Sequence, residues 1–325
     1  MYQRFYGLRE LPFELTPNPK FLFLTPGHRE ALSNLQYGVS SAKSLTVLVG
    51  EAGTGKTTLL RAVLESEENT RVQWVYLNNP LLTREDFVRT LAIRFALGAE
   101  AGLSKSAFVD ALERALVERR ARGETTVLVV DEAQSLSYEL LEEIRLLANI
   151  ETSTEKLLVV ILAGQPEFAA RLNEPGLRQL KQRVALRCEI APFQLSETAA
   201  YVGSRIRTAG GEAQLFTREA VMASHEHARG IPRTINVICD NSLLGAFALG
   251  RPQVDREIVL EVVRDFDFRG DGAGDRRAAA QAAAVAAAAA PAHAAPVRDD
   301  VDVAPVPPPR VVRPRRFAFF GAARS

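Results

Sequence analysis

The sequence predicts an α/β fold, a three-layer α/β/α domain with a five-stranded parallel sheet, followed by an all-helical domain and a tail. Three observations lead to this prediction. Short apolar runs of strand length alternate with helical periodicity up to about residue 190. The first of these runs leads directly into a glycine-rich loop, and another ends in a pair of acids. From residue 196 onward only helical periodicity remains.

The glycine-rich loop follows the apolar run Leu45–Val49, which is typical of a buried parallel strand. Residues 50–57 read Gly-Glu-Ala-Gly-Thr-Gly-Lys-Thr and fit the pattern G-x-x-x-x-G-K-[ST]. A helical pattern begins at Thr58. Glycines let successive backbone N–H groups turn toward a phosphate, and the start of the next helix adds a partial positive charge. The strand, loop and helix together therefore predict a nucleotide-binding site.

Individual residues of this loop have different expected roles. Lys56 is expected to reach the β- and γ-phosphates, and the Thr57 hydroxyl is expected to ligate Mg²⁺. The predicted cofactors are therefore ATP and Mg²⁺. The expected nucleotide contacts in this segment are Gly50, Glu51, Ala52, Gly53, Thr54, Gly55, Lys56, Thr57 and Thr58.

Two adjacent acids end the apolar strand predicted over 126–130. Burying carboxylates is costly, so acids at the end of a buried strand, where open α/β sheets bind ligands, indicate function. We expect Asp131 to hold Mg²⁺ directly or through water, and Glu132 to orient and deprotonate the water that attacks the γ-phosphate. A further strand, 72–77, separates the loop strand from the acid strand along the chain, as in ATPases that use a catalytic glutamate.

A polar amide follows the next predicted strand, 156–163. Gln165 is expected to lie beside the γ-phosphate and the attacking water, in the role called sensor 1. The alternative is that Gln165 only caps the helix that begins at Pro166.

Arginines precede the fifth predicted strand, 184–190. An arginine before that strand lies away from its own nucleotide and can enter the site of a neighbouring subunit, where it neutralises charge on the γ-phosphate. Arg183 is the first candidate for this role in catalysis and Arg178 is the second. The alternative is a solvated surface arginine.

The helical region is predicted to form a lid over the nucleotide. Its third helix begins with Pro232 and Arg233, after Gly230 and Ile231. This arrangement places Arg233 at a helix start that faces the nucleotide, with Pro232 beside it. We expect Arg233 to contact the γ-phosphate and so to close the lid, the role called sensor 2. We expect Thr217 and Asp255 to cap two of the helices. The predicted helices are 196–209, 217–228, 231–248 and 255–266.

The two ends of the chain differ in composition from the middle. Residues 1–28 are rich in proline and aromatic residues, which predicts an extended segment without regular elements, covering either the adenine or the core. Residues 269–325 are rich in Ala, Pro and Arg and cannot build a packed core, so that we expect disorder there. A transient helix at 276–290 and a partner- or membrane-binding role for 313–320 are alternatives. The predicted domains are 1–44, 45–192, 193–268 and 269–325.

Composition bounds the classes of function that remain. The net charge is +1, with residues 1–268 slightly acidic (−3) and the rest slightly basic (+4), which argues against strong nucleic-acid binding through charge alone. Cys188 and Cys239 are isolated, so a disulfide framework is not expected. The sequence shows neither a signal peptide nor an apolar run long enough to cross a membrane, and we expect a cytoplasmic protein.

As a set, the motifs resemble those of an AAA+ ATPase. They are Gly50–Thr57, Asp131-Glu132-Ala133-Gln134, Gly164-Gln165-Pro166-Glu167, Gln182-Arg183 and Gly230-Ile231-Pro232-Arg233. The opening segment, with Phe5-Tyr6-Gly7-Leu8, Pro17-Asn18-Pro19-Lys20-Phe21 and His28-Arg29-Glu30-Ala31-Leu32, is similar to that of the ExeA/GspA family of the general secretion pathway.

The resemblance covers about residues 1–266 and implies ATP hydrolysis, a homo-oligomer with shared sites, and a partner in secretion, pilus or exopolysaccharide assembly that recruits the protein to the inner membrane. Full-length members of that family continue into a transmembrane helix and a peptidoglycan-binding region, which this sequence lacks. Transposition-regulator ATPases (TnsC/TniB-like) share much of the same core, so an ATP-dependent, DNA-bound regulator stays open as the alternative function.

Overall fold

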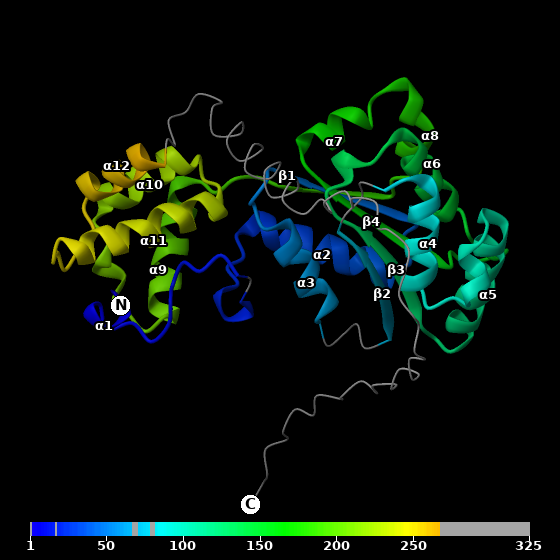
Figure 1. Cartoon of the computed structure of the whole chain (residues 1–325), viewed down its shortest axis with the longest axis horizontal. Coiled ribbons are helices and arrows are strands. Elements are labelled where there is room, and N and C mark those ends of the chain that lie inside the picture. Colours follow the sequence, from blue (N-terminus) through cyan, green and yellow to red (C-terminus); the bar gives the residue numbers. More distant parts are fainter. Residues whose placement is uncertain (1, 17, 67–70, 79–81, 267–325) are drawn as a thin grey trace, which may run out of the picture. The chain divides into compact units, whose positions relative to one another are not determined.

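A computed structural model describes residues 2–16, 18–66, 71–78 and 82–266 of the chain (Figure 1). The predictions made for the tail, 269–325, lie outside these residues. Within the described part of the chain, no helix is both long enough and apolar enough to span a membrane.

Five parallel strands form one sheet, as the sequence predicts. They are β1 (Leu45–Gly50), β2 (Val72–Leu77), β3 (Thr125–Val130), β4 (Leu158–Gly164) and β5 (Leu186–Ile190). Their order across the sheet is β2-β3-β4-β1-β5. In space, β4 therefore separates the loop strand from the acid strand, whereas β2, which separates them in sequence, lies at one edge.

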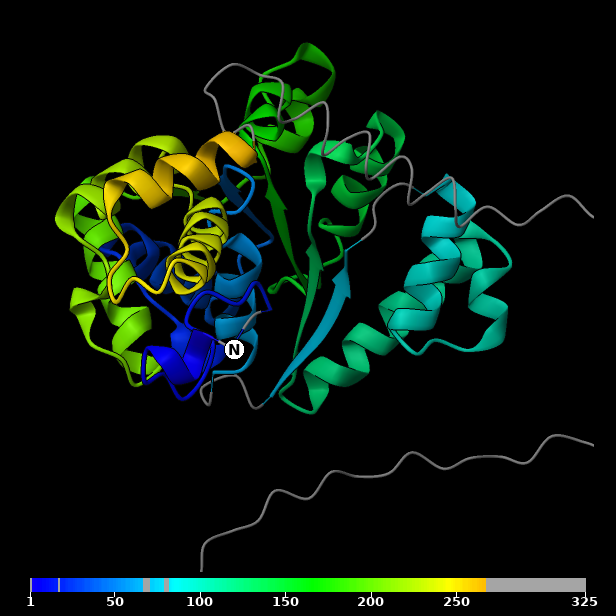
Figure 2. The same ribbon diagram turned by 60° about the vertical axis from the view of Figure 1, so that its left-hand side comes forward.

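Helices cover both faces of the sheet and give the predicted three layers (Figure 2). One face packs against α2 (Pro26–Ser40) and α3 (Lys56–Leu64). The other packs against α4 (Arg84–Arg94), α5 (Lys105–Ala121), α6 (Tyr138–Leu147), α7 (Pro166–Arg171) and α8 (Arg178–Lys181). Short 3₁₀ turns connect these elements at Ala99–Gly102, Ala133–Ser135 and Pro175–Leu177.

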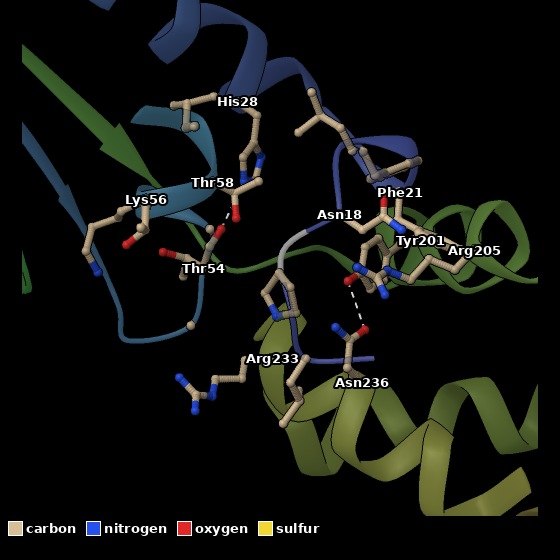
Figure 3. Close-up of a pocket in the computed structure, with 18 of the residues that line it drawn as sticks. Asn18, Phe21, His28, Thr54, Lys56, Thr58, Tyr201, Arg205, Arg233 and Asn236 are labelled. Carbon is tan, nitrogen blue, oxygen red and sulfur yellow. Dashed lines mark hydrogen bonds between the residues drawn. The ribbon is translucent and has the colours of Figure 1, made fainter. Parts of the chain in front are cut away.

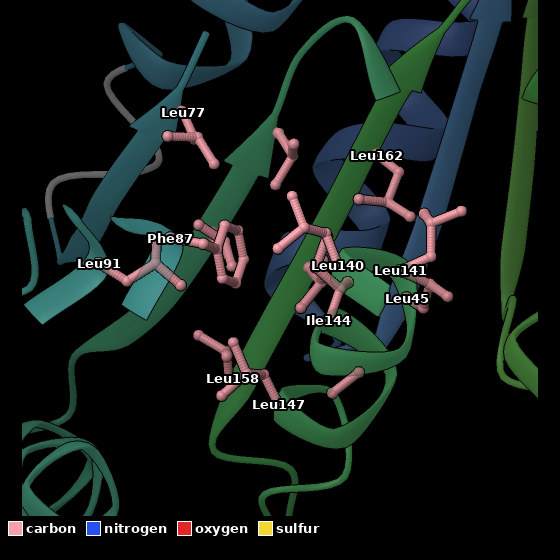
Figure 4. Packing of buried hydrophobic residues seen from close by; sticks show 14 of the residues in the cluster. Leu45, Leu77, Phe87, Leu91, Leu140, Leu141, Ile144, Leu147, Leu158 and Leu162 are labelled. Atoms are coloured by element: carbon pink, nitrogen blue, oxygen red, sulfur yellow. The ribbon is translucent and has the colours of Figure 1, made fainter. Parts of the chain in front are cut away.

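Alternation along the strands divides the apolar side chains between the two faces. In β4, Leu158, Val160 and Leu162 point to the α4–α8 face, while Val159 and Ile161 point to the α2–α3 face. Figure 4 shows Leu162 and Leu45 of the sheet against Leu140, Leu141 and Ile144 of α6. Burying each side chain of this size contributes about 1.5–3 kcal/mol, so this layer holds the strand ends, and thus the site, in place.

The predicted helices of the second region are also present, with bounds shifted by at most one residue. They are α9 (Leu195–Thr208), α10 (Arg218–Ala228), α11 (Pro232–Ala248) and α12 (Arg256–Asp265), with a 3₁₀ turn at Ala213–Leu215. Thr217 Oγ1 accepts a hydrogen bond from Ala220 N at 3.1 Å, and Asp255 Oδ1 accepts one from Ile258 N at 3.1 Å. Both predicted helix caps are thus confirmed.

The N-terminal segment (residues 2–25) is more ordered than the sequence suggests. The prediction that it has no regular elements is wrong, because Tyr2–Phe5 forms a helical turn (α1) and Pro19–Phe21 a 3₁₀ turn (η1). Its aromatic side chains pack on the helical region, which stabilises turns that the prolines alone disfavour. The Tyr2 hydroxyl donates to Asp240, and the Tyr6 hydroxyl donates to the Arg251 carbonyl at 3.0 Å.

Both cysteines are free and buried, Cys188 in β5 and Cys239 in α11. Burial raises the pKa of the Cys188 thiol to about 11 and that of the Cys239 thiol to about 12. Since the thiolate is the reactive form, we expect a disulfide reagent at pH 8 to label the native chain roughly 100-fold more slowly than the denatured chain. Absorbance of the released thiol dye measures both rates. Rapid labelling of either cysteine in the native chain would contradict the buried placement.

Candidate functional site

The phosphate-binding loop (residues 50–57) connects the carboxyl end of β1 to the start of α3. Gly53 and Gly55 have positive φ angles of 84° and 100°, a conformation that side chains with a Cβ rarely adopt. A Cβ at Gly50 would lie 2.8 Å from the Ile190 carbonyl oxygen of β5. The glycines of the loop are thus required by its backbone conformation and its tight packing.

Lys56 stabilises the loop through hydrogen bonds from its side chain to the loop backbone. Its Nζ donates to the carbonyl oxygens of Gly50 at 2.8 Å and Glu51 at 3.0 Å, and its side chain is buried. Burial lowers the pKa of Lys56, while the neighbouring carboxylates, led by Glu132, act to raise it. The ammonium group therefore lies in a low-dielectric position where a nearby phosphate would be attracted strongly.

Asp131 meets Thr57 at the ends of β3 and the loop. Thr57 Oγ1 donates to Asp131 Oδ2 at 2.7 Å, and the Glu132 N–H donates to Oδ1 at 2.9 Å. The Tyr76 hydroxyl, from the neighbouring strand β2, donates to the same Oδ2 at 2.6 Å. Sequence reasoning missed Tyr76, because only the register of β2 against β3 brings it to the acid.

The Thr57 hydroxyl and the Asp131 carboxylate are oxygen ligands that suit Mg²⁺. Within the described residues, no group of three or more His, Cys, Asp or Glu side chains could hold a metal alone. Mg²⁺, however, is usually bound by one or two protein oxygens together with water and substrate phosphates. The Thr57 hydroxyl can donate a hydrogen bond to Asp131 and still offer an oxygen lone pair to the cation. Both predicted residues therefore suit the binding of Mg²⁺.

Glu132 is exposed and lies beside two glutamine side chains. Gln134 Nε2 donates to Glu132 Oε2 at 2.6 Å, and Gln165 Nε2 lies 3.4 Å from the same oxygen. Gln134 Oε1 also accepts from the Gln165 N–H at 3.1 Å. Gln165 occupies the N-cap position of α7, as the alternative requires, but its side chain makes no cap hydrogen bond there and lies beside Glu132 instead. Gln134 is a second residue that sequence reasoning did not single out.

The backbone of Glu132 is strained. Its φ is 55°, in the left-handed region that a residue with a Cβ seldom occupies, at a cost of about 1–3 kcal/mol. The conformation directs the carboxylate away from β3 and toward Gln134 and Gln165, which lie at the ends of β3 and β4. Such strain persists where surrounding contacts enforce it, and it is frequent at active sites.

The helical region contacts the loop through the start of α11. The Arg233 N–H donates to the Gly53 carbonyl at 3.2 Å, and Pro232 and Arg233 line the same cavity as the loop. The turn before α11 is tightly fixed, since a Cβ at Gly230 would lie 2.1 Å from the Phe193 carbonyl oxygen. The structure thus places Pro232 and Arg233 at the cavity, as their predicted role requires.

The cavity has a volume of about 400 Å³ and extends from the loop to the N-terminal segment and α9 (Figure 3). The Tyr201 hydroxyl donates to Asn236 Oδ1 at 2.9 Å within it. The Arg205 guanidinium lies 5.1 Å from the ring centroids of both Phe21 and Tyr201. The N-terminal segment therefore both packs on the helical core and lines the cavity, so its two predicted roles are not exclusive.

Arg183 and Arg178 lie elsewhere. Both side chains are exposed, and neither lines the cavity. Arg183 precedes the amino end of β5, whereas the loop follows the carboxyl end of the parallel strand β1. The five residues of β5, about 16 Å of strand, thus separate Arg183 from the loop of its own chain.

Comparison with known proteins agrees with this geometry. Residues 39–172 match the family model described as AAA domain. General secretion pathway protein A of Aeromonas hydrophila is 40% identical over 254 residues, which are 78% of this chain and 46% of that protein. Mu-like prophage FluMu DNA transposition protein B of Haemophilus influenzae is 28% identical over 160 residues, 49% of this chain and 50% of that one. The chain thus spans about half the length of these relatives.

Solved structures share the fold at low sequence identity. Cdc6p from Pyrobaculum aerophilum superposes with a TM-score of 0.61 and 20% identity over 78% of this chain and 70% of that chain. The ORC2 protein of Aeropyrum pernix gives a TM-score of 0.57 and 17% identity over 78% and 71%. Residues 39–172 thus match an AAA domain, the chain has the fold of these solved structures, and over 254 residues it is similar to general secretion pathway protein A.

Proposed function

We propose that the chain is an ATPase that binds ATP with Mg²⁺ in the cavity beside the phosphate-binding loop and hydrolyses it. The observation that carries this proposal is the meeting of Thr57, Asp131 and Glu132 at the end of the loop. A site for binding alone would need the loop and the lysine. It would not need a strained, exposed glutamate held by two amides beside a cation site.

Each side chain has a distinct part in the proposed reaction. Lys56 and the loop N–H groups neutralise and orient the phosphates, and bound Mg²⁺ offsets negative charge on the phosphate oxygens. Glu132 accepts the proton of the attacking water, while Gln134 and Gln165 fix the direction of its carboxylate. Arg233 is close enough to the loop to connect the γ-phosphate with the position of α11.

We further propose that the site is completed by a second copy of the chain. Arg183 is exposed and lies a strand length from its own loop, which supports a role in the site of a neighbour rather than in its own. The ATP cycle would then change both the contact between subunits and the helical region, which is how an oligomer passes motion to a partner.

The similarity to general secretion pathway protein A supports a role in secretion or a related envelope-assembly system, with recruitment to the inner membrane through a partner. The similarity to a DNA transposition protein favours a second candidate, an ATP-dependent regulator bound to DNA. The slightly acidic balance of residues 1–268 supports the first candidate over the second.

The first prediction concerns the proposed base. Glu132→Gln keeps the shape of the side chain and its contacts but cannot accept a proton, so we expect turnover to fall by about 100-fold or more. ATP affinity, measured by calorimetry, should stay within about threefold. Glu118→Gln, an exposed glutamate of α5, is the matched control and should change neither quantity. Turnover above a tenth of the wild-type rate in Glu132→Gln would exclude this residue as the base.

The second prediction concerns the shared site. Arg183→Ala should lower turnover by about 10³-fold, as expected for an arginine that acts on a neighbour's γ-phosphate. Mixing Arg183→Ala with Glu132→Gln should restore activity, because some interfaces then combine an intact base with an intact arginine. Arg187→Ala, exposed in β5, serves as the control. If the mixture is no more active than the sum of its components, Arg183 does not act between subunits.

A third prediction separates the two candidate roles. We expect no ATP-dependent binding of duplex DNA by the full chain at about 0.15 M salt, as followed by fluorescence anisotropy. A DNA-bound regulator would instead bind with an affinity that falls steeply and log-linearly with salt, since counterions are released from the phosphates. Tight binding of that kind, strengthened by ATP, would replace the secretion role with the DNA-bound role.

A further inference from the structure

Several carbonyl oxygens of the phosphate-binding loop are held by the loop's own lysine and by donors from two other helices. Lys56 Nζ binds those of Gly50 and Glu51, and the Arg233 N–H binds that of Gly53. The ring of His28, from α2, lies with its Nε2 3.1 Å from the Thr54 carbonyl oxygen. Donors from α3, α11 and α2 thus bind four carbonyl oxygens of the loop, those of Gly50, Glu51, Gly53 and Thr54.

These contacts determine where the N–H groups of the loop point. A peptide unit is planar and trans, so that its C=O and the N–H of the following residue point in opposite directions. When Nε2 of His28 holds the Thr54 carbonyl, the Gly55 N–H must point away from His28. Within the described residues, no hydrogen bond uses the Gly55 N–H, and so it is available to an anion.

His28 has one hydrogen-bonding arrangement that satisfies all its partners. A carbonyl oxygen only accepts, so Nε2 carries the proton. In the neutral ring Nδ1 then only accepts, so the Thr25 hydroxyl, whose Oγ1 lies 2.7 Å away and also accepts from the backbone N–H of His28 at 3.3 Å, donates to Nδ1. Burial lowers the pKa of His28, in agreement with a neutral ring.

The Thr54–Gly55 peptide is the one in this loop that most needs support from outside. It ends at Gly55, whose φ is 100° and whose lack of a Cβ makes rotation of the peptide plane easy, and the residue before Thr54 is a second glycine with positive φ. The side chain of Thr54 is bonded to the Glu51 carbonyl and leaves its own carbonyl to His28. No other described donor contacts the Thr54 carbonyl.

We infer that His28 is a positioning residue of the phosphate site, which holds the Thr54–Gly55 peptide plane so that the Gly55 N–H faces the bound phosphate. This inference rests on the proposed function, since it names what prepares that site for ATP. The ring also contacts Phe193, 5.7 Å away between centroids, where the chain enters the helical region. One side chain thereby connects the N-terminal segment, the loop and the start of the helical region.

Two amide substitutions separate the hydrogen bond from packing. The Gln side-chain nitrogen can take the place of His Nε2 and reach the Thr54 carbonyl, whereas that of Asn takes the place of Nδ1 and cannot. His28→Phe keeps a ring of similar size without any donor. His227→Phe, on α10 and outside the cavity, is the matched control.

The first measurement is hydrogen–deuterium exchange of the peptide covering residues 50–58 in the full chain without nucleotide. We expect exchange in His28→Asn and His28→Phe to be about tenfold faster than in the wild type, the effect of losing one buried hydrogen bond. His28→Gln and His227→Phe should stay within about threefold. Because no nucleotide is involved, this readout decides the role of His28 even if the wild-type chain binds no ATP, a result that would refute only the proposed function.

The second measurement is the Kd for ATP of the same variants, below the melting temperature of each. We expect His28→Asn and His28→Phe to bind about tenfold more weakly, and His28→Gln to bind as the wild type does. Wild-type exchange and affinity in His28→Asn would overturn the inference. Equal losses in His28→Gln and His28→Asn would also overturn it, because ring packing rather than the donor would then be responsible. If His28→Phe fails to fold, the Gln and Asn pair still gives the answer.

Discussion

A loop can point its N–H groups toward an anion only if its carbonyl oxygens point away from that anion and are bound by other hydrogen-bond donors. In this chain the buried ammonium of Lys56, the backbone N–H of Arg233 in α11 and the ring of His28 supply that hold. Each donor comes from a different element, so the loop keeps its conformation only when α2, α3 and the helical region are all in place. Packing against the sheet fixes α2 and α3 relative to β1, while α11 belongs to the separate core of the helical region and contacts the loop through Arg233.

The residues proposed to act on the nucleotide follow the next two strands of the sheet beyond β1, which are β4 and β3. Asp131 and Glu132 follow β3, and Gln165 follows β4. Because the strands are parallel, the cation site and the base lie at the carboxyl ends of the strands, where the loop also lies. Arg183, the arginine proposed to act on the γ-phosphate, lies at the opposite, amino ends of the strands. In the proposed assembly the two ends of the sheet contribute to different sites, which is why we expect assembly and turnover to depend on each other.

Local sequence predicts this fold well where the signal is local. The octet 50–57, the acids after β3 and the helix caps are each set by neighbouring residues, and their placement agrees with the prediction. The sequence assigns no individual role to Tyr76, Gln134 or His28, because their partners are set by strand register and packing. The order of the strands and the turns α1 and η1 depend in the same way on contacts that are distant in sequence.

The central claim is that this loop, this acid pair and a neighbour's arginine form one ATPase site. A structure of the Glu132→Gln chain assembled with ATP and Mg²⁺ tests it most directly. We expect the Gly55 N–H and Lys56 on the phosphates, Thr57 on the cation, and Arg183 of a second copy within hydrogen-bond distance of the γ-phosphate. An ATP-bound assembly in which each site contains only residues of its own chain, or a nucleotide bound away from the loop, would contradict the claim.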